Sequence, residues 1–378
     1  MMKVLARWIT GLLLLLCHGI LVSGVGEHVD PPYTEEERQA EYIRRGHRWP
    51  PEIYPDNPGW KNIFLQRLSQ VGALTDSQMK WDGYIQTVTA AMMQNYTEFG
   101  WGLTRGPEQL TNDIRQAIFE GLPTAKPEGD IDVIDGPIPL FIDRPDLTAR
   151  ALEELQPILE AWSGIELIPS IAYGFRLYRN ESRLWMHVDK TQTHVISCIY
   201  HIASSDDAKP WPIVIEDYSG KTNSVILKPG DILLYESAKN FHGRPTYFNG
   251  SFYTSLFVHF YPKDPEWASH DHDLDGHFAL PPDWSEVIPS EHPRVIVHGT
   301  SIMMPDCPDA WCPLADADHY EGPGEYGVVM TGGGKKYSLE LDEEEDGDYY
   351  DEEGEEDEEY DDGEEEEGED EGDYDDGD

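Results

Sequence analysis

The sequence predicts an α+β protein with three parts: a helical N-terminal region, an antiparallel β-sandwich or jelly roll, and a disordered acidic tail. Apolar residues recur at helical spacing up to about residue 164, and short β-like runs separated by turn residues follow. From Glu340 to Asp378 the chain carries 28 acidic residues and no Lys or Arg. The predicted segments are a signal peptide (1–24), a mainly helical region (25–164), the β domain (165–265), an irregular Pro-, His- and Asp-rich extension (266–338) and the polyacidic tail (339–378).

The charge of this 378-residue chain limits its partners. The chain has 27 Lys and Arg against 74 Asp and Glu, a net charge of −47, of which −19 remains outside the acidic tail. Such a protein is repelled by phosphate backbones, so nucleic-acid binding is excluded. Its hydrophobic content of 39% is sufficient for a folded core.

The first 24 residues are typical of a signal peptide. Lys3 and Arg7 precede an apolar run over residues 8–22, and the small residues Ser23 and Gly24 follow. Cleavage near Gly24 is the first interpretation, and an uncleaved signal anchor is the alternative. No later segment is apolar enough to cross a bilayer, so we expect no stable membrane insertion. The expected location is therefore the secretory lumen or the cell exterior, and the sequence shows no C-terminal KDEL-type retention signal.

Sequons and cysteines agree with a secretory location. Three glycosylation sequons begin at Asn95, Asn180 and Asn249. Cys307 and Cys312 lie in a Pro-rich stretch and suit a local disulfide, whereas Cys198 lies in an apolar run and is predicted to be a buried free thiol.

Each predicted element has a local signal. Thr34 and Glu37 form a capping box that opens a short charged helix. Helical apolar spacing follows in residues 60–71, 81–92, 107–121 and 146–164. Strands are predicted at residues 167–178, 185–188, 194–202, 212–216, 224–228, 231–236 and 252–261.

A metal-ligating pattern lies within the predicted strands. Residues two apart on a strand face the same side, so His187 and Asp189 can hold one metal ion. His242, 53 residues after Asp189, would complete a set of two His and one carboxylate from a facing strand. This set suits octahedral iron and leaves three coordination positions open.

Residues 170–262 resemble the Fe(II)/2-oxoglutarate dioxygenases, in particular the prolyl 4-hydroxylase-like group with its double-stranded β-helix. His187, Asp189 and His242 match the iron ligands of that group, and Tyr178 matches a tyrosine that helps to bind 2-oxoglutarate nine residues before the first His. The resemblance implies Fe(2+), 2-oxoglutarate and O2, with ascorbate as reductant. It also implies hydroxylation of a residue in a peptide or protein substrate, with proline favoured.

One position departs from the group. A Lys that pairs with the far carboxylate of 2-oxoglutarate is usual ten residues after the distal His, where this chain has Phe252. A buried dianion needs a cation. Arg176 is the first candidate because it shares a strand face with Tyr178, and Arg244, two residues after His242, is the second. A different co-substrate is the remaining alternative.

Two lesser motifs lie beyond the predicted β domain. Residues 271–276 match the first half of a Ca2+ loop, but Pro282 stands where an EF-hand needs Glu, so the choice is between a looser Ca2+ site and a solvated acidic loop. His270, His272 and His277 form a sequence cluster that suits a transition metal.

The acidic tail predicts weak, high-capacity Ca2+ binding or, in the simpler interpretation, only solubility. It also motivates an alternative function. The protein would then be a secreted acidic matrix protein that binds Ca2+ or a mineral surface and carries a catalytically idle jelly roll.

Overall fold

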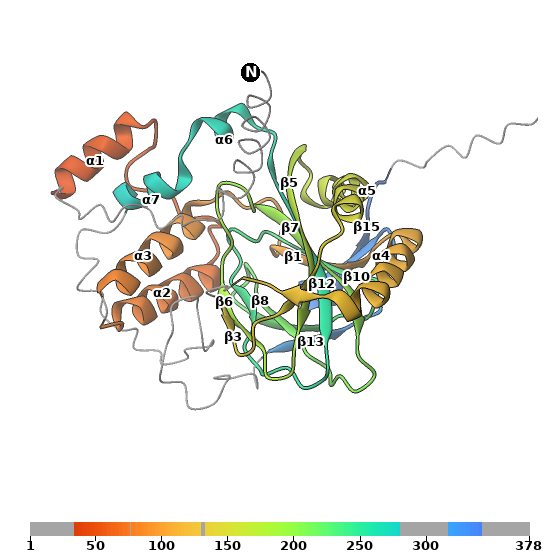
Figure 1. The fold of residues 1–378 in the computed structure, drawn as a ribbon. Coiled ribbons are helices and arrows are strands. Elements are labelled where there is room, and N and C mark those ends of the chain that lie inside the picture. The colour runs from red at the N-terminus through yellow and green to blue at the C-terminus, as the bar shows by residue number, and fades with distance from the viewer. Residues whose placement is uncertain (1–33, 76, 130–132, 280–316, 342–378) are drawn as a thin grey trace, which may run out of the picture. The chain divides into compact units, whose positions relative to one another are not determined.

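The computed structural model describes residues 34–75, 77–129, 133–279 and 317–341 (Figure 1). The predicted signal peptide, Cys307, Cys312 and the tail beyond Leu341 lie outside these ranges. The chain divides into two units, Met1–Leu341 and Asp342–Asp378, and all of the described residues belong to the first.

The first three helices form a separate hydrophobic cluster. α1 (Glu35–Arg44) begins with the predicted capping box, in which Thr34 accepts from the backbone of Glu37 and the Glu37 side chain accepts in return. α2 (Pro58–Gly72) and α3 (Ser77–Met92) follow, and α7 (His272–Ala279) returns from far along the chain to pack with them. Tyr42, Leu68, Val88 and Phe278 are buried together in this cluster.

Two buried cations join these helices to the β structure. Arg67 of α2 forms an ion pair with Glu216, and both side chains are buried. Lys239 donates to the carbonyls of Ala90 at 3.0 Å, Ala91 at 3.3 Å and Met93 at 2.5 Å, at the carboxyl end of α3. A cation is favourable there because the last carbonyls of a helix have no partners within it.

In the described ranges the strands form one nine-stranded and one six-stranded sheet (Figure 1). The larger sheet contains, in spatial order, β15 (Lys335–Ser338), β14 (Val328–Thr331), β1 (Trp101–Arg105), β10 (Asp231–Tyr235), β7 (Ile196–Ser204), β12 (Tyr253–Pro262), β5 (Leu167–Tyr178), β4 (Leu140–Ile142) and β2 (Lys126–Pro127). The smaller contains β13 (Asp318–Glu321), β9 (Thr222–Ile226), β8 (Ile213–Glu216), β11 (His242–Arg244), β6 (Arg183–His187) and β3 (Ile134–Asp135). Neighbouring strands are antiparallel except β13 and β9, which are parallel.

Strand alternation decides which side chains line the interior between the sheets. On β7, Cys198 and Tyr200 face the cluster formed with α4 (Glu108–Gly121) and α5 (Pro145–Ser163), whereas Ile199 faces the other sheet. Ile199 packs there with Ile213 and Ile215 of β8. The fold is therefore the predicted jelly roll, with α4 and α5 covering the outer face of the larger sheet.

The structure adds elements that the sequence did not predict. The region expected to be mainly helical also contributes β1 to β4, and β1 inserts between β10 and β14 of the larger sheet. The extension expected to be irregular contains α6 (Pro265–Ser269), α7 and β13 to β15. Several of these short strands pair with strands that are distant in sequence, as β1 does with β10 and β13 with β9, so local spacing does not predict them.

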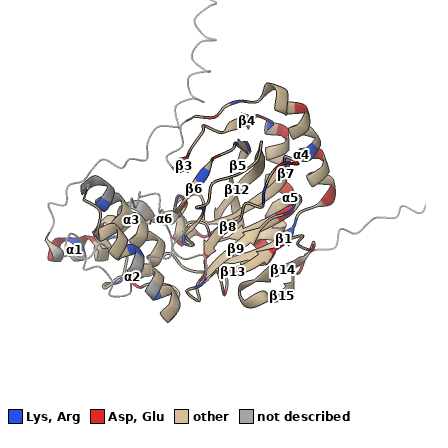
Figure 2. Ribbon diagram, turned by 90° about the horizontal axis from the view of Figure 1, so that it is seen from below, with Lys and Arg blue, Asp and Glu red and all other residues tan. Residues whose placement is uncertain are grey.

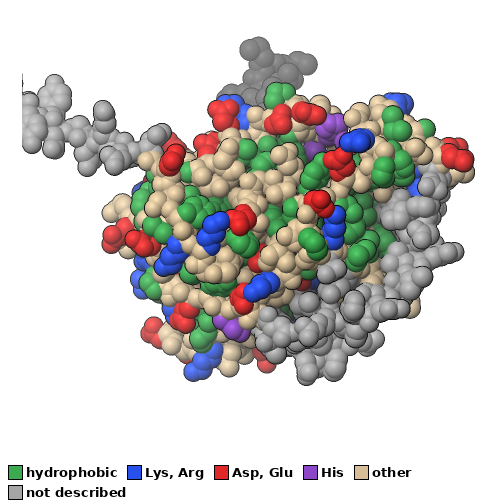
Figure 3. Space-filling model, turned by 180° about the vertical axis from the view of Figure 1, so that it is seen from behind, with side chains coloured by type: hydrophobic (Ala, Val, Ile, Leu, Met, Phe, Trp, Pro, Cys, Tyr) green, Lys and Arg blue, Asp and Glu red, His purple; other side chains and the backbone are tan. Residues whose placement is uncertain are grey.

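Acidic residues are prominent along α4 and α5 (Figure 2). Charges of both signs are interspersed over the face shown in Figure 3. Among the described helices, none combines the length and apolarity needed to cross a membrane.

The sequons and Cys198 have the following surroundings. Asn180 and Asn249 are exposed on adjacent turns, where Gly250 donates to Asn180 Oδ1 at 3.4 Å, and Asn95 is half-buried. Cys198 is a buried free thiol, as predicted. Burial raises its pKa.

Candidate active site

The three predicted iron ligands come together at one pair of strands and the segment that follows β6. His187 ends β6, His242 begins β11, and the two residues are direct partners in the antiparallel register. Asp189 lies two residues beyond His187. One ligand atom from each of the three side chains lies within 4.8 Å of the others, close enough for a single metal ion.

Both imidazoles are oriented by the backbone. His187 Nδ1 lies 2.7 Å from the carbonyl oxygen of Trp185, and His242 Nδ1 lies 2.9 Å from that of Asn240. A carbonyl only accepts, so each Nδ1 carries the proton and each Nε2 keeps its lone pair. The two Nε2 atoms lie 3.4 and 3.7 Å from Asp189 Oδ1. The residues therefore fit a divalent metal without rotation of either ring.

The site is electrostatically prepared for a cation. Burial lowers the pKa of His242 to about 4, with the nearby His187 acting in the same direction. Burial by itself would raise the pKa of Asp189, but the adjacent imidazoles of His242, His187 and His259 more than offset this effect and lower it. The resting site therefore presents a neutral His242 and a carboxylate.

Further side chains hold the ligands, and the sequence prediction did not include them. Tyr235 of β10 donates to Asp189 Oδ2 at 3.4 Å, and its ring lies edge-on to His242 with centroids 4.6 Å apart. His259 of β12 lies 3.9 Å from the same carboxylate oxygen and 2.8 Å from the hydroxyl of Ser197. The sequence did contain a signal for Tyr235 and His259. Both fall on predicted strands, at positions whose side chains alternate toward the interior.

Two of the three predicted co-substrate residues, Tyr178 and Arg244, contact Trp211, and the third, Arg176, contacts Tyr178. The Tyr178 ring lies 5.0 Å from that of Trp211, and Arg176 Nη1 donates to the Tyr178 hydroxyl at 3.4 Å. Arg244 lies over the rings of Trp211 and Tyr253, 4.6 Å from each centroid, and donates to the Tyr253 hydroxyl at 3.1 Å.

The two arginines differ in their partners. Arg176 makes a bidentate ion pair with Glu128, with distances of 2.7 and 2.9 Å. Arg244 is only 2% exposed, donates to the carbonyl of Trp211 and forms no ion pair with any carboxylate that the structure describes. Its positive charge is therefore the one still available to an anion.

Phe252, at the position of the expected Lys, does not face the interior. It packs with Phe119 of α4, with ring centroids 6.3 Å apart. The next residue, Tyr253, takes the inward position and stacks on His201 at 4.1 Å.

Comparisons with known proteins find similarity in solved structures only. No protein-family model matches the chain, and the search of curated proteins finds no significant match. A Pseudomonas putida prolyl-4-hydroxylase is 14% identical over 48% of this chain and 100% of its own, with a TM-score of 0.35. HygX from Streptomyces hygroscopicus, solved with nickel and 2-oxoglutarate, is 13% identical over 44% of this chain and 83% of its own, with a TM-score of 0.34.

A third similar structure is a prolyl hydroxylase from Trichoplax adhaerens in complex with a peptide fragment of hypoxia inducible factor. It is 9% identical over 50% of this chain and 95% of its own, with a TM-score of 0.35. The matched structures are mainly Fe(II)/2-oxoglutarate oxygenases. Because these identities and TM-scores are low, the function proposed below rests on the residues of the site itself.

Proposed function

We propose that this chain is an Fe(II)/2-oxoglutarate-dependent dioxygenase of the secretory pathway that hydroxylates a residue in a peptide or protein. One observation carries the proposal. His187, Asp189 and His242 present three ligand atoms within 4.8 Å of one another, the two histidines from the paired strands β6 and β11 and Asp189 from just beyond β6. Two His and one carboxylate on one face of a metal are the ligand set of non-haem Fe(II) oxygenases.

In this proposal each ligand has a defined task. His187 and His242 would hold iron through Nε2, while their Nδ1–H groups donate to the carbonyls of Trp185 and Asn240. Bound iron, together with 2-oxoglutarate and O2, supplies the oxidising power to hydroxylate a C–H bond, and ascorbate serves as reductant. Asp189 keeps its carboxylate on the metal, which favours hydroxylation over halogenation because a halogenase leaves that position to a halide.

We assign Arg244 as the anchor of the far carboxylate of 2-oxoglutarate, with Tyr178 beside it. Arg244 is a buried cation that lacks a described carboxylate partner, and the dianion would provide one. Arg176, the first candidate from sequence, is already neutralised by Glu128. The structure therefore favours the reverse order of the two arginines.

The kind of substrate and the cellular location are inferred from the sequence. A peptidyl substrate, with proline favoured, follows from the resemblance of residues 170–262. Residence in the secretory lumen or outside the cell follows from the segment 1–24, and the exposure of Asn180 and Asn249 supports glycosylation there.

Turnover in the absence of a known substrate tests the proposal. The purified protein with Fe(2+), ascorbate and 2-oxoglutarate should form succinate slowly. His187→Ala and Asp189→Ala should abolish this activity, and His28→Ala, in the similar motif His28-Val29-Asp30, is the matched control. Equal succinate formation by the protein and both triad variants would contradict the proposal.

A second candidate function rests on the 28 acids between Glu340 and Asp378. They favour a secreted protein that binds Ca2+ or a mineral surface, with an idle jelly roll. Ca2+ binding by the tail is itself compatible with the dioxygenase, since a tail of this kind can hold an enzyme at a Ca2+-rich surface. Only the second function predicts that no turnover is present.

A further inference from the structure

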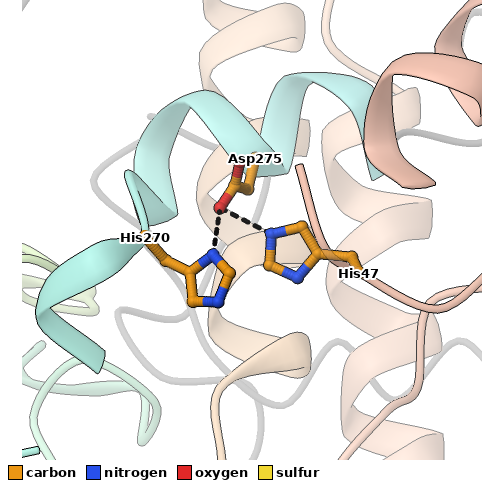
Figure 4. Close-up of side chains that lie close together, drawn as sticks. All are labelled: His47, His270 and Asp275. Atoms are coloured by element: carbon orange, nitrogen blue, oxygen red, sulfur yellow. Dashed lines mark hydrogen bonds and ion pairs between the residues drawn. The ribbon is translucent and has the colours of Figure 1, made fainter. Parts of the chain in front are cut away.

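A second group of metal-ligating side chains lies outside the proposed active site. His47 follows α1, His270 lies between α6 and α7, and Asp275 lies within α7 (Figure 4). Over the described ranges, this group and the His187 group are the ones that bring three such atoms within 4.8 Å of one another. His47 and Asp275 are 228 residues apart in the chain.

The group differs from what the sequence motifs predicted. Residues 272–279 form a helix, so residues 271–276 make neither a loop-type Ca2+ site nor the alternative, a solvated acidic loop. Of the three histidines expected to cluster, only His270 joins the group. His272 instead stacks on Trp267 with ring centroids 3.8 Å apart.

The carboxylate of Asp275 is held in a fixed orientation. Its side chain is 4% exposed, and Oδ1 accepts from Arg45 at 3.3 Å. Oδ2 lies 2.7 Å from His47 Nε2 and 3.7 Å from His270 Nδ1. One carboxylate oxygen thus accepts from Arg45, and the other lies next to two imidazole nitrogens. Ligating carboxylates are commonly oriented by a hydrogen bond of this kind.

Neighbouring rings position the imidazoles. The His47 ring stacks on Tyr42, with centroids 4.5 Å apart, and lies tilted against the His270 ring at 4.4 Å. Tyr42 is itself held by its hydroxyl, which lies 3.3 Å from Met92 Sδ. Side chains locked in this way lose little conformational entropy when they bind an ion.

The group borders a cavity of about 270 Å3 that has room for an ion and water. The charged side chains among its described lining residues are Asp264, Glu266 and Asp275, and no Lys or Arg lines it. Arg45, which pairs with Asp275 from outside this lining, offsets one of the three negative charges, and the remaining two favour a cation.

We propose that His47 Nε2, His270 Nδ1 and Asp275 Oδ2 bind a zinc ion, with water from the cavity as the fourth ligand. Two imidazoles and one carboxylate are a usual zinc set, whereas Ca2+ and Mg2+ prefer oxygen ligands. The ion would join the segment after α1 to α6 and α7. This inference does not depend on the iron centre, because the two groups share no residue.

The test counts the zinc ions that each full-length protein retains after equilibration with a weak chelator. Excess Ca2+ is present to occupy the acidic tail, so that zinc held there is not counted. The wild type should retain two zinc ions, because zinc also fits the His187 group. His187→Ala and His270→Ala should each retain one, and the double variant none. His272→Ala, which changes the same cavity but not the group, should retain two.

Affinity and folding are measured alongside. In the His187→Ala background, His270→Ala or Asp275→Asn should weaken zinc binding about 100-fold or more, and far-ultraviolet circular dichroism should show unchanged helix content. Zinc should also raise the Tm of His187→Ala alone, a measurement that needs no change in the second group. Three results would overturn the proposal. They are loss of all zinc from His187→Ala, equal zinc retention by His270→Ala and the wild type, and tighter retention of iron than of zinc by His187→Ala.

Discussion

His187 and His242 are direct register partners on the antiparallel strands β6 and β11, and their ring centroids lie 4.5 Å apart. Asp189 completes the group from the segment that directly follows β6, where its backbone N–H donates to the Ser237 carbonyl at 2.8 Å. The strand pair therefore holds two of the three proposed iron ligands, and side chains held by strands keep their geometry better than side chains on loops.

Arg244→Met should raise the apparent KM for 2-oxoglutarate about 10- to 150-fold, because a hydrogen bond to a charged group contributes about 1.5–3 kcal/mol. Arg244→Lys keeps the positive charge and should recover part of the loss. Succinate formation as a function of 2-oxoglutarate concentration measures both. Arg115→Met, on the exposed side of α4, is the control. An unchanged KM in Arg244→Met would exclude Arg244 as the anchor.

Arg176→Met should act on stability instead. It leaves Glu128 buried without its bidentate partner, and breaking a buried ion pair costs about 3–5 kcal/mol. The double variant Arg176→Met, Glu128→Gln should recover most of that free energy of unfolding, measured by urea denaturation. A large rise in the KM for 2-oxoglutarate with little loss of stability would instead restore Arg176 as the anchor.

His201 should make the protein less stable in acid. Burial, and then the charge of Arg244, lower its pKa to about 3 in the folded state, against about 6.5 in an unfolded chain. Between these values the unfolded chain binds a proton that the folded protein does not, so stability falls as the pH falls. The contribution is about 1.4 kcal/mol per pH unit.

His201→Asn tests this effect. His201 Nδ1 donates to the Thr254 carbonyl oxygen at 3.0 Å, and the asparagine amide can donate to the same oxygen but does not titrate. Urea denaturation from pH 7.5 to 5 should show a shallower slope for the variant below about pH 6.5. Parallel curves for the two proteins would mean that His201 is protonated in the folded state.

Cys198 should resist thiol reagents in the native protein. It is buried, and its pKa is raised by burial, so almost no thiolate is present at pH 8. Labelling followed by mass spectrometry should find Cys198 modified only after unfolding. If Cys307 and Cys312 form the predicted disulfide, they should stay unlabelled without a reductant. Rapid native labelling of Cys198 would contradict its placement on β7.

Removal of the acidic tail should abolish most low-affinity Ca2+ uptake while turnover persists. The truncation belongs after Leu341, because Leu339 donates to the Gly327 carbonyl at 2.7 Å and both leucines pack on the main core. Calorimetry should show uptake that weakens with salt, since exposed charges are screened beyond about 8 Å at physiological ionic strength. Unchanged Ca2+ uptake after truncation would exclude the tail as the binding element.

The sequence by itself determined the local structure and the proposed iron ligands. The capping box at Thr34, the strand Leu167–Tyr178 and the shared face of Arg176 and Tyr178 all follow from spacings of a few residues. Such spacings are set by the helical and strand periods, which the chain carries locally. His187 and Asp189 could be recognised for the same reason.

Only the tertiary structure decided which charges are free and which distant residues meet. Glu128 neutralises Arg176 across 48 residues of sequence, and this pairing is the reason that we propose Arg244 as the anchor. Tyr235 and His259 reach Asp189 from separate strands, and His47 meets Asp275 from the opposite end of the described chain. Contacts of this kind depend on how the two sheets and the helices pack, and no local period encodes that packing.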